Sequence, residues 1–144
     1  MRIRGSASFL EYADLPDHRA DAATKEALRY RRFLHYAEGS MMPPLLALLV
    51  VGRLGLLGRP AKKPLLAMFG RHLDWLESEL AARDWFAGGE FSAADIMMSF
   101  PLEAARQRAG LDDSRPNLID WLERIHARPA YAEALKRGGP YAYA

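Results

Sequence analysis

The fold of this chain is decided by one stretch, residues 88–102, which reads GGEFSAADIMMSFPL. Within it, the Ser92 hydroxyl can accept a hydrogen bond from the backbone N–H of Asp95, and the Asp95 carboxylate can accept one from the N–H of Ser92. This reciprocal pair is a capping box, which marks the start of a helix. Phe91 and Ile96 have the spacing of a hydrophobic staple, which fixes the angle at which the chain enters that helix.

The helix that starts there is apolar on every side. Between residues 93 and 105 the only charged side chains are those of Asp95 and Glu103. A helix without a polar stripe has to be surrounded by other helices. The sequence therefore predicts a buried central helix at about residues 92–109, with Ser92 and Asp95 in a structural, capping role. Capping explains Asp95 better than acid catalysis does.

Apolar residues at three- and four-residue spacing predict helices on both sides of this one. The first runs from Asp21, is kinked at the pair Pro43-Pro44, and continues to about Val51. A loop is expected over residues 52–63, followed by a second long helix that starts at Pro64 and pairs with the first as an antiparallel hairpin. Two shorter helices follow residue 110, and no strand pattern is present. We predict an all-α five-helix bundle.

Composition limits the function. The chain has 144 residues, no cysteine and a net charge of +2 from mostly interspersed charges, which predicts one soluble domain that does not bind nucleic acid. Without cysteine there is no thiol nucleophile or thiolate metal site, and a reducing compartment is suitable, so the cytoplasm is expected. The four histidines lack metal-binding spacing, and no metal is predicted.

The stretch 41–57 is almost wholly apolar, as a membrane-spanning helix is. Its uninterrupted apolar core, residues 45–51, is much shorter than the roughly 20 residues that cross a bilayer. It is interpreted as a buried helix, and no membrane partner is predicted.

The most suggestive polar cluster lies in the first helix. His35 and Glu38 are three residues apart and share a side, while Tyr36 and Ser40 point elsewhere, and the kink just beyond opens space beside them. The cluster either binds a ligand, or is a surface pair with Tyr36 packed at an interface. Tyr141, near the end of the chain, either covers a pocket or frays.

Several motifs in order resemble the C-terminal, all-helical domain of glutathione transferases, over about residues 21–140. These are WLESEL at 75–80, WFAG at 85–88, FSAADI at 91–96 and RPAY at 128–131, and HYAEGSMMP at 35–43 resembles the first helix of that domain in one branch of the family. The resemblance implies that residues 21–144 are this helical domain. Residues 1–20 would then be the remnant of the end of a thioredoxin-like domain plus a linker.

In the family, the thioredoxin-like domain holds glutathione and activates its thiol. Residues 5–12, GSASFLEY, are similar to the family's Glu-Ser-Gly-Ala-Ile-Val-Glu-Tyr, so Ser6 aligns with the serine that binds the γ-glutamyl end and Gly5 replaces the acid. The thiol-activating residue has no counterpart, and no catalytic residue is assigned. By resemblance, the glutathione-binding residues are Ser6, His35 and Glu38, and the substrate-binding residues are Tyr36, Ser40, Met41 and Tyr141.

Two functions follow from this resemblance. Joined to an N-terminal half, the chain would act in a glutathione S-transferase that conjugates the co-substrate glutathione to small hydrophobic electrophiles. It would supply the hydrophobic substrate pocket and a homodimer interface formed by the first two helices. Alternatively, it is a stand-alone, non-catalytic helical module that binds a protein partner or holds a ligand.

Overall fold

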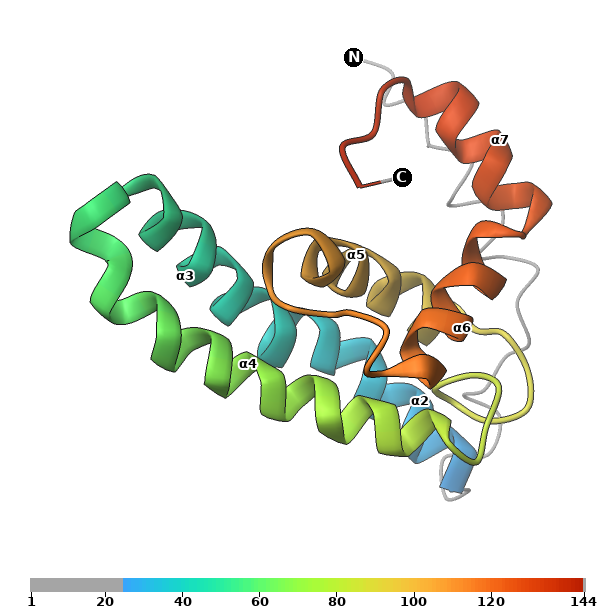
Figure 1. Cartoon of the computed structure of the whole chain (residues 1–144). Helices are drawn as coiled ribbons and strands as arrows, with labels where there is room; N and C mark the ends of the chain where they lie inside the picture. Colours follow the sequence, from blue (N-terminus) through green and yellow to red (C-terminus); the bar gives the residue numbers. More distant parts are fainter. Residues whose placement is uncertain (1–24, 144) are drawn as a thin grey trace, which may run out of the picture.

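The computed structural model describes residues 25–143, and all regular elements in this part of the chain are helical (Figure 1). In order they are α2 (Lys25–Tyr36), a π-helical segment (Ala37–Met41), α3 (Met42–Arg53), a 3₁₀ turn (Gly55–Gly58), α4 (Arg59–Leu80), α5 (Ala93–Arg108), α6 (Pro116–His126) and α7 (Pro129–Gly138). Counting α2 to α3 as one long helix, this confirms the predicted five-helix bundle.

Two prolines lie inside the long first helix, where the sequence predicts a kink. The structure has a π-helical turn there, closed by the backbone N–H of Met42, which bonds to the carbonyl of Ala37 five residues earlier. This wider turn places Pro43 and Pro44 in the first turn of α3, where a missing N–H removes fewer helical bonds. The helix therefore passes the prolines without ending.

The prediction of a loop over residues 52–63 is wrong, because most of this segment is helical. Gly55, with φ of 58°, makes the turn, and α4 begins at Arg59 rather than at Pro64. Pro60 stands in the first turn of α4, where its missing N–H would have had no partner in any case. Here glycine allows a tight turn and proline begins a helix. Little of the segment is therefore irregular.

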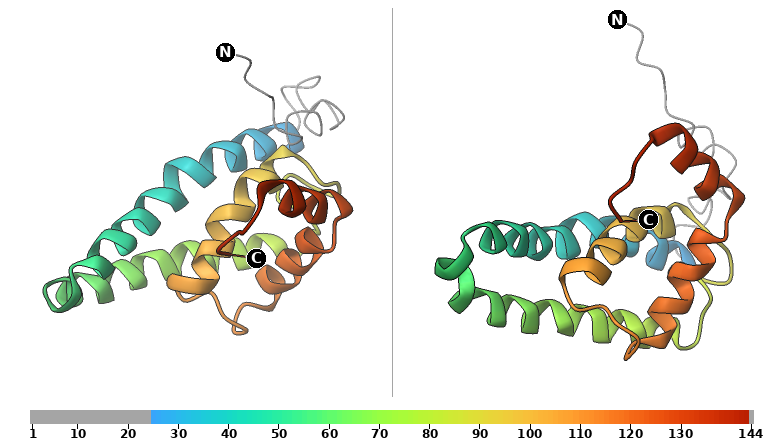
Figure 2. Two further views of the ribbon diagram at one scale, coloured as in Figure 1. Left: turned by 90° about the horizontal axis from the view of Figure 1, so that it is seen from above. Right: turned by 45° about the horizontal axis from the view of Figure 1, so that its top comes forward.

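The predicted central helix is confirmed as α5. It lies against α2, α3 and α6 (Figure 2). Its buried residues include Met98, Leu102 and Ala105. Ser92 at its start has an extended backbone, and both arms of the capping box are present. The antiparallel partners α3 and α4 form a long hairpin that extends away from α6 and α7 (Figures 1 and 2).

The start of α6 receives its cap from another helix. The carboxylate of Glu77, on α4, accepts hydrogen bonds from the backbone N–H of Asn117 at 3.0 Å and of Leu118 at 2.9 Å. A carboxylate at a helix N-terminus satisfies orphan donors and is favoured by the helix dipole. Pro116 stands in the first turn of this helix, and the cap comes from forty residues away in sequence.

Candidate functional site

The polar residues of the first helix lie around the π-helical segment and divide between two environments. His35 and Glu38 are exposed, whereas Tyr36 and Ser40 are partly buried. Met41 is fully buried in the core of the bundle. Of the residues assigned by resemblance, His35 and Glu38 therefore face outward, Tyr36 and Ser40 lie at the boundary of the core, and Met41 lies behind them. Ser6 lies outside the described residues.

Tyr36 is held by residues of α4. Its hydroxyl lies 2.5 Å from Nδ1 of His72, and its ring centroid is 4.9 Å from that of Trp75. Burial raises the pKa of Tyr36 to about 12, and the nearby Arg32 guanidinium opposes this rise. The phenol is therefore protonated at neutral pH, where it can act in hydrogen bonds and as an apolar surface but not as a base.

A second polar cluster surrounds Glu103 on α5, and Tyr141 is the one member of it that the sequence predicted as a site residue. This carboxylate is only 3% exposed. Its Oε1 is 3.0 Å from Nε2 of His126 and accepts a bond from the Tyr131 hydroxyl at 2.9 Å, while Oε2 accepts one from the Tyr141 hydroxyl. A cavity of about 260 Å³ lies beside the cluster and is lined by Ser99, Glu103, Tyr131, Leu135 and Tyr141, among others.

The electrostatics of this cluster favour tyrosines that donate and a carboxylate that accepts. Burial raises the pKa of Tyr131 and of Tyr141, and the charge of Glu103 raises both further. The sequence does contain a signal for this site, since Glu103 is a lone acid within an otherwise apolar stretch of a buried helix. Its partners come from α6, α7 and the tail, at sequence separations of 23 to 38 residues.

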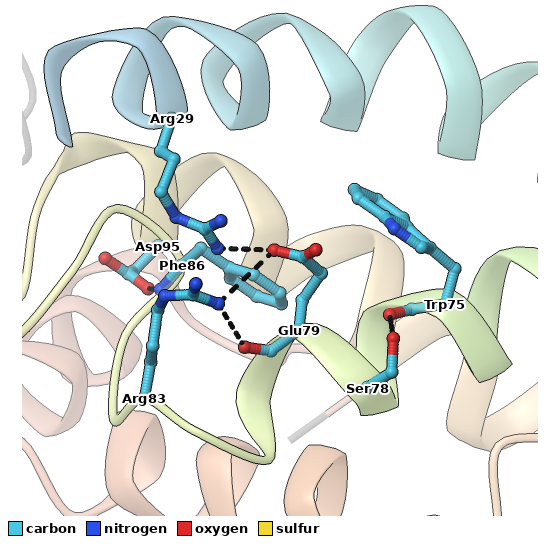
Figure 3. A network of polar contacts seen from close by, with 7 residues as sticks. All are labelled: Arg29, Trp75, Ser78, Glu79, Arg83, Phe86 and Asp95. Atoms are coloured by element: carbon cyan, nitrogen blue, oxygen red, sulfur yellow. Dashed lines mark hydrogen bonds and ion pairs between the residues drawn. The ribbon is translucent and has the colours of Figure 1, made fainter. Parts of the chain in front are cut away.

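A third polar network lies where α2, α4 and the start of α5 meet (Figure 3). Glu79 pairs with Arg29 at 2.5 Å and with Arg83 at 3.5 Å. To the left of this pair in Figure 3, Asp95 points toward the backbone of Phe86, whose N–H donates to Oδ1 at 3.0 Å. These contacts join elements of the bundle, and two of the residues, Arg29 and Arg83, also line an open hollow of about 370 Å³.

Asp95 is fully buried, and its carboxylate accepts hydrogen bonds that stabilise the fold. Oδ2 accepts hydrogen bonds from the backbone N–H and the hydroxyl of Ser92, both at 3.0 Å, and Oδ1 accepts from Phe86 and from Nε1–H of Trp121. Burial raises the pKa of Asp95, and these donors oppose that rise. Both oxygens are occupied, which fits the capping role. Among residues 25–143, no three potential metal ligands gather in one place.

Comparison with known protein families agrees with the observed helical bundle. Residues 17–124 match the family described as "Glutathione S-transferase, C-terminal domain". The chain belongs to this family, and its all-helical bundle is the C-terminal domain that the family's motifs predicted.

Similar proteins include glutathione S-transferase 1 of Saccharomyces cerevisiae, which is 27% identical over 81% of this chain and 56% of the relative. A solved glutathione S-transferase from Actinobacillus pleuropneumoniae is 26% identical, with a TM-score of 0.70, over 90% of this chain and 56% of that one. A sphingomonad glutathione S-transferase in complex with glutathione is 27% identical, with a TM-score of 0.70, over 84% of this chain and 58% of that one. This chain spans little more than half the length of these relatives.

Proposed function

We propose that this chain provides the helical half of a glutathione S-transferase that conjugates glutathione to small hydrophobic electrophiles when joined to a thioredoxin-like half. The observation that carries the proposal is the family match over residues 17–124. It is supported by the likeness to a transferase solved in complex with glutathione, over 84% of this chain. Residues 21–144 would form the helical domain, with residues 1–20 as the remnant of the other domain and a linker.

In this reaction the glutathione thiolate attacks an electrophilic carbon, a carbon–sulfur bond forms, and the leaving group departs with its electron pair. The described residues would bind and orient rather than react. We assign Tyr36, Ser40, Met41 and Tyr141 to the hydrophobic substrate pocket. Of these, Tyr141 lines the cavity beside Glu103, and Met41 is buried in the core. A largely apolar pocket with a few fixed hydroxyl groups is typical of small-molecule sites.

The glutathione side of the site would use Ser6, His35 and Glu38. His35 and Glu38 are exposed on the long first helix and are therefore open to a domain or ligand that lies against it. We further propose a homodimer through the first two long helices, supported by two exposed leucines on the first of them, Leu28 at 57% and Leu46 at 59%. The proposed compartment is the cytoplasm.

The proposal is tested by supplying a thioredoxin-like half. Residues 1–144 alone should show no saturable heat in a calorimetric titration with glutathione, because the proposed thiol site lies on the other domain. A fusion to the thioredoxin-like half of the sphingomonad relative should conjugate glutathione to chlorodinitrobenzene, with that half alone as the control. A folded fusion that binds glutathione but gains no conjugation over the control would contradict the proposal.

The alternative is a stand-alone, non-catalytic module that binds a protein partner or holds a ligand. The same fusion separates the two functions, because the module predicts that the helical half adds nothing to the rate of conjugation.

A further inference from the structure

We propose that the tip of the α3–α4 hairpin, residues 53–63, binds the surface of membranes that contain anionic lipids. The tip lies at the far end of the hairpin from α6 and α7 (Figure 1). It presents three leucines to solvent: Leu54 is 54% exposed, Leu56 is 73% exposed and Leu57 is 86% exposed. Exposed leucines that are close together on a projecting element indicate an interaction surface.

The charge around the tip has one sign. Residues 39–73 contain no Asp or Glu, and five of them are Lys or Arg. Four of the five lie on the tip itself, are exposed, and form no ion pair with another residue in the range 25–143: Arg53, Arg59, Lys62 and Lys63. The tip therefore combines apolar side chains at its end with unpaired positive charges beside them.

The positive surface continues into a hollow between α3, α4 and the end of α5. This hollow of about 670 Å³ is lined by Arg53, Lys62, Arg106 and Arg108, with Asp112 as its one acidic residue, and by Leu48, Leu49, Leu66 and Leu111. A partner at the tip thus meets cations on three helices, which favours an extended anionic surface over a single charged group.

An anionic bilayer fits both features, because lipid headgroups attract the cations and the acyl boundary accepts the leucines. A second copy of the chain fits poorly, since tip-to-tip contact would bring the same four positive charges together on both sides. Nucleic acid would satisfy the cations but leave the leucines in water. The homodimer proposed above involves leucines on the bodies of the helices and leaves the tip free.

Binding to a membrane surface does not require a helix that crosses the membrane. The continuous helix Lys25–Arg53 is long and apolar enough, by length and composition, to cross a membrane. One side of it, however, packs on α4 and α5 through residues such as Phe33, Leu45 and Leu48. The apolar stretch that the sequence assigned to a buried helix is thus buried on one side only, and its end is exposed at the tip. We infer shallow insertion of the tip leucines.

Vesicle flotation of the full chain tests the proposal. It should bind vesicles of equal parts phosphatidylglycerol and phosphatidylcholine, more weakly as salt is added, and should not bind phosphatidylcholine alone. Replacing two cations, in the double variant Lys62→Gln and Lys63→Gln, should weaken binding about 30-fold. The double variant Leu56→Ser and Leu57→Ser should also lose binding, while Lys136→Gln, at an exposed position far from the tip, should match the parent chain.

Insertion has its own readout because the chain contains no cysteine. A Leu57→Cys variant labelled with nitrobenzoxadiazole should shift its emission to the blue on anionic vesicles, and a labelled Lys136→Cys variant should not. Four results would overturn the proposal: equal binding to neutral vesicles, no emission shift at position 57, tip variants that change oligomeric state rather than vesicle binding, or tip-dependent binding of duplex DNA without vesicle binding.

Discussion

The indole Nε1–H of Trp121, on α6, donates a hydrogen bond to Oδ1 of Asp95, on α5, across 3.2 Å. The same oxygen accepts a hydrogen bond from the backbone N–H of Phe86, and the other oxygen accepts one from the backbone N–H of Ser92. One carboxylate therefore begins the central helix, closes the loop before it and positions α6. Trp121 and Phe86 also pack on each other, with ring centroids 5.0 Å apart.

Replacement of Asp95 should therefore destabilise the whole bundle. Asp95→Ala leaves four buried donors without an acceptor and should lower the free energy of unfolding by about 3 to 5 kcal/mol. Asp95→Asn keeps an oxygen for Phe86 and Trp121 but places an amide against Ser92, so it should lie between Ala and the parent chain. Urea unfolding followed by circular dichroism measures both.

Asp112→Ala is the matched control, because Asp112 is exposed and serves only its own turn through Ser114. It should unfold close to the parent chain. Equal effects at positions 95 and 112 would show that the buried carboxylate does not hold the bundle together.

The parts of this structure that the sequence predicts are those set by neighbours along the chain. Ser92 and Asp95 are three residues apart, and their capping box was predictable from that spacing. The bond from Trp121 to Asp95 spans 26 residues, and the cap of α6 by Glu77 spans forty, so neither has a local signature. Helical periodicity predicts the bundle, but the hydrogen bonds that stabilise it depend on tertiary packing.

The candidate site shows the same division. The two-sided arrangement of His35, Tyr36 and Glu38 follows from helical spacing and was predicted. The bond between Tyr36 and His72 was not, because it joins two helices across 36 residues. The cluster at Glu103 was missed because a lone acid in an apolar helix does not reveal which helices will supply its donors. The ligand-binding roles of these residues remain predictions.

Tyr141 is expected to fasten the tail of the chain to α5. Tyr141→Phe removes the donor to Glu103 but keeps the ring, so the tail should open more often, by about fivefold, since a bond to a carboxylate at this partly exposed position contributes about 1 kcal/mol. Hydrogen exchange at residues 139–143 measures this opening. Tyr143→Phe retains the ring contact with Phe100 and should leave exchange unchanged. Similar exchange in both variants would argue against fastening through Glu103.

Stability should fall in alkali partly because of Tyr36. Its pKa is raised from 10.0 to about 12 in the folded chain, so the unfolded chain loses this proton first. The stabilisation is complete below pH 10 and is lost as the pH rises through about 12. Denaturant unfolding across this interval should show a decline that is smaller in Tyr36→Phe. A phenolate absorbance change near pH 10 that disappears in Tyr36→Phe would show that the residue is not shielded.

The two glycines on either side of the hairpin turn should respond in opposite ways to alanine. A Cβ at Gly58 would lie 2.1 Å from the carbonyl oxygen of Val51, so the backbone of the turn has to move, and Gly58→Ala should destabilise the chain by about 2 to 4 kcal/mol. A Cβ at Gly52 meets nothing within 4 Å, and this residue lies in helical α3, where Gly52→Ala should stabilise by about 0.5 to 1 kcal/mol. If residues 52–63 were the flexible loop that their composition suggests, both substitutions would be nearly neutral. Opposite shifts in thermal unfolding would establish that the turn is closely packed, whereas equal shifts would contradict this tight turn between α3 and α4.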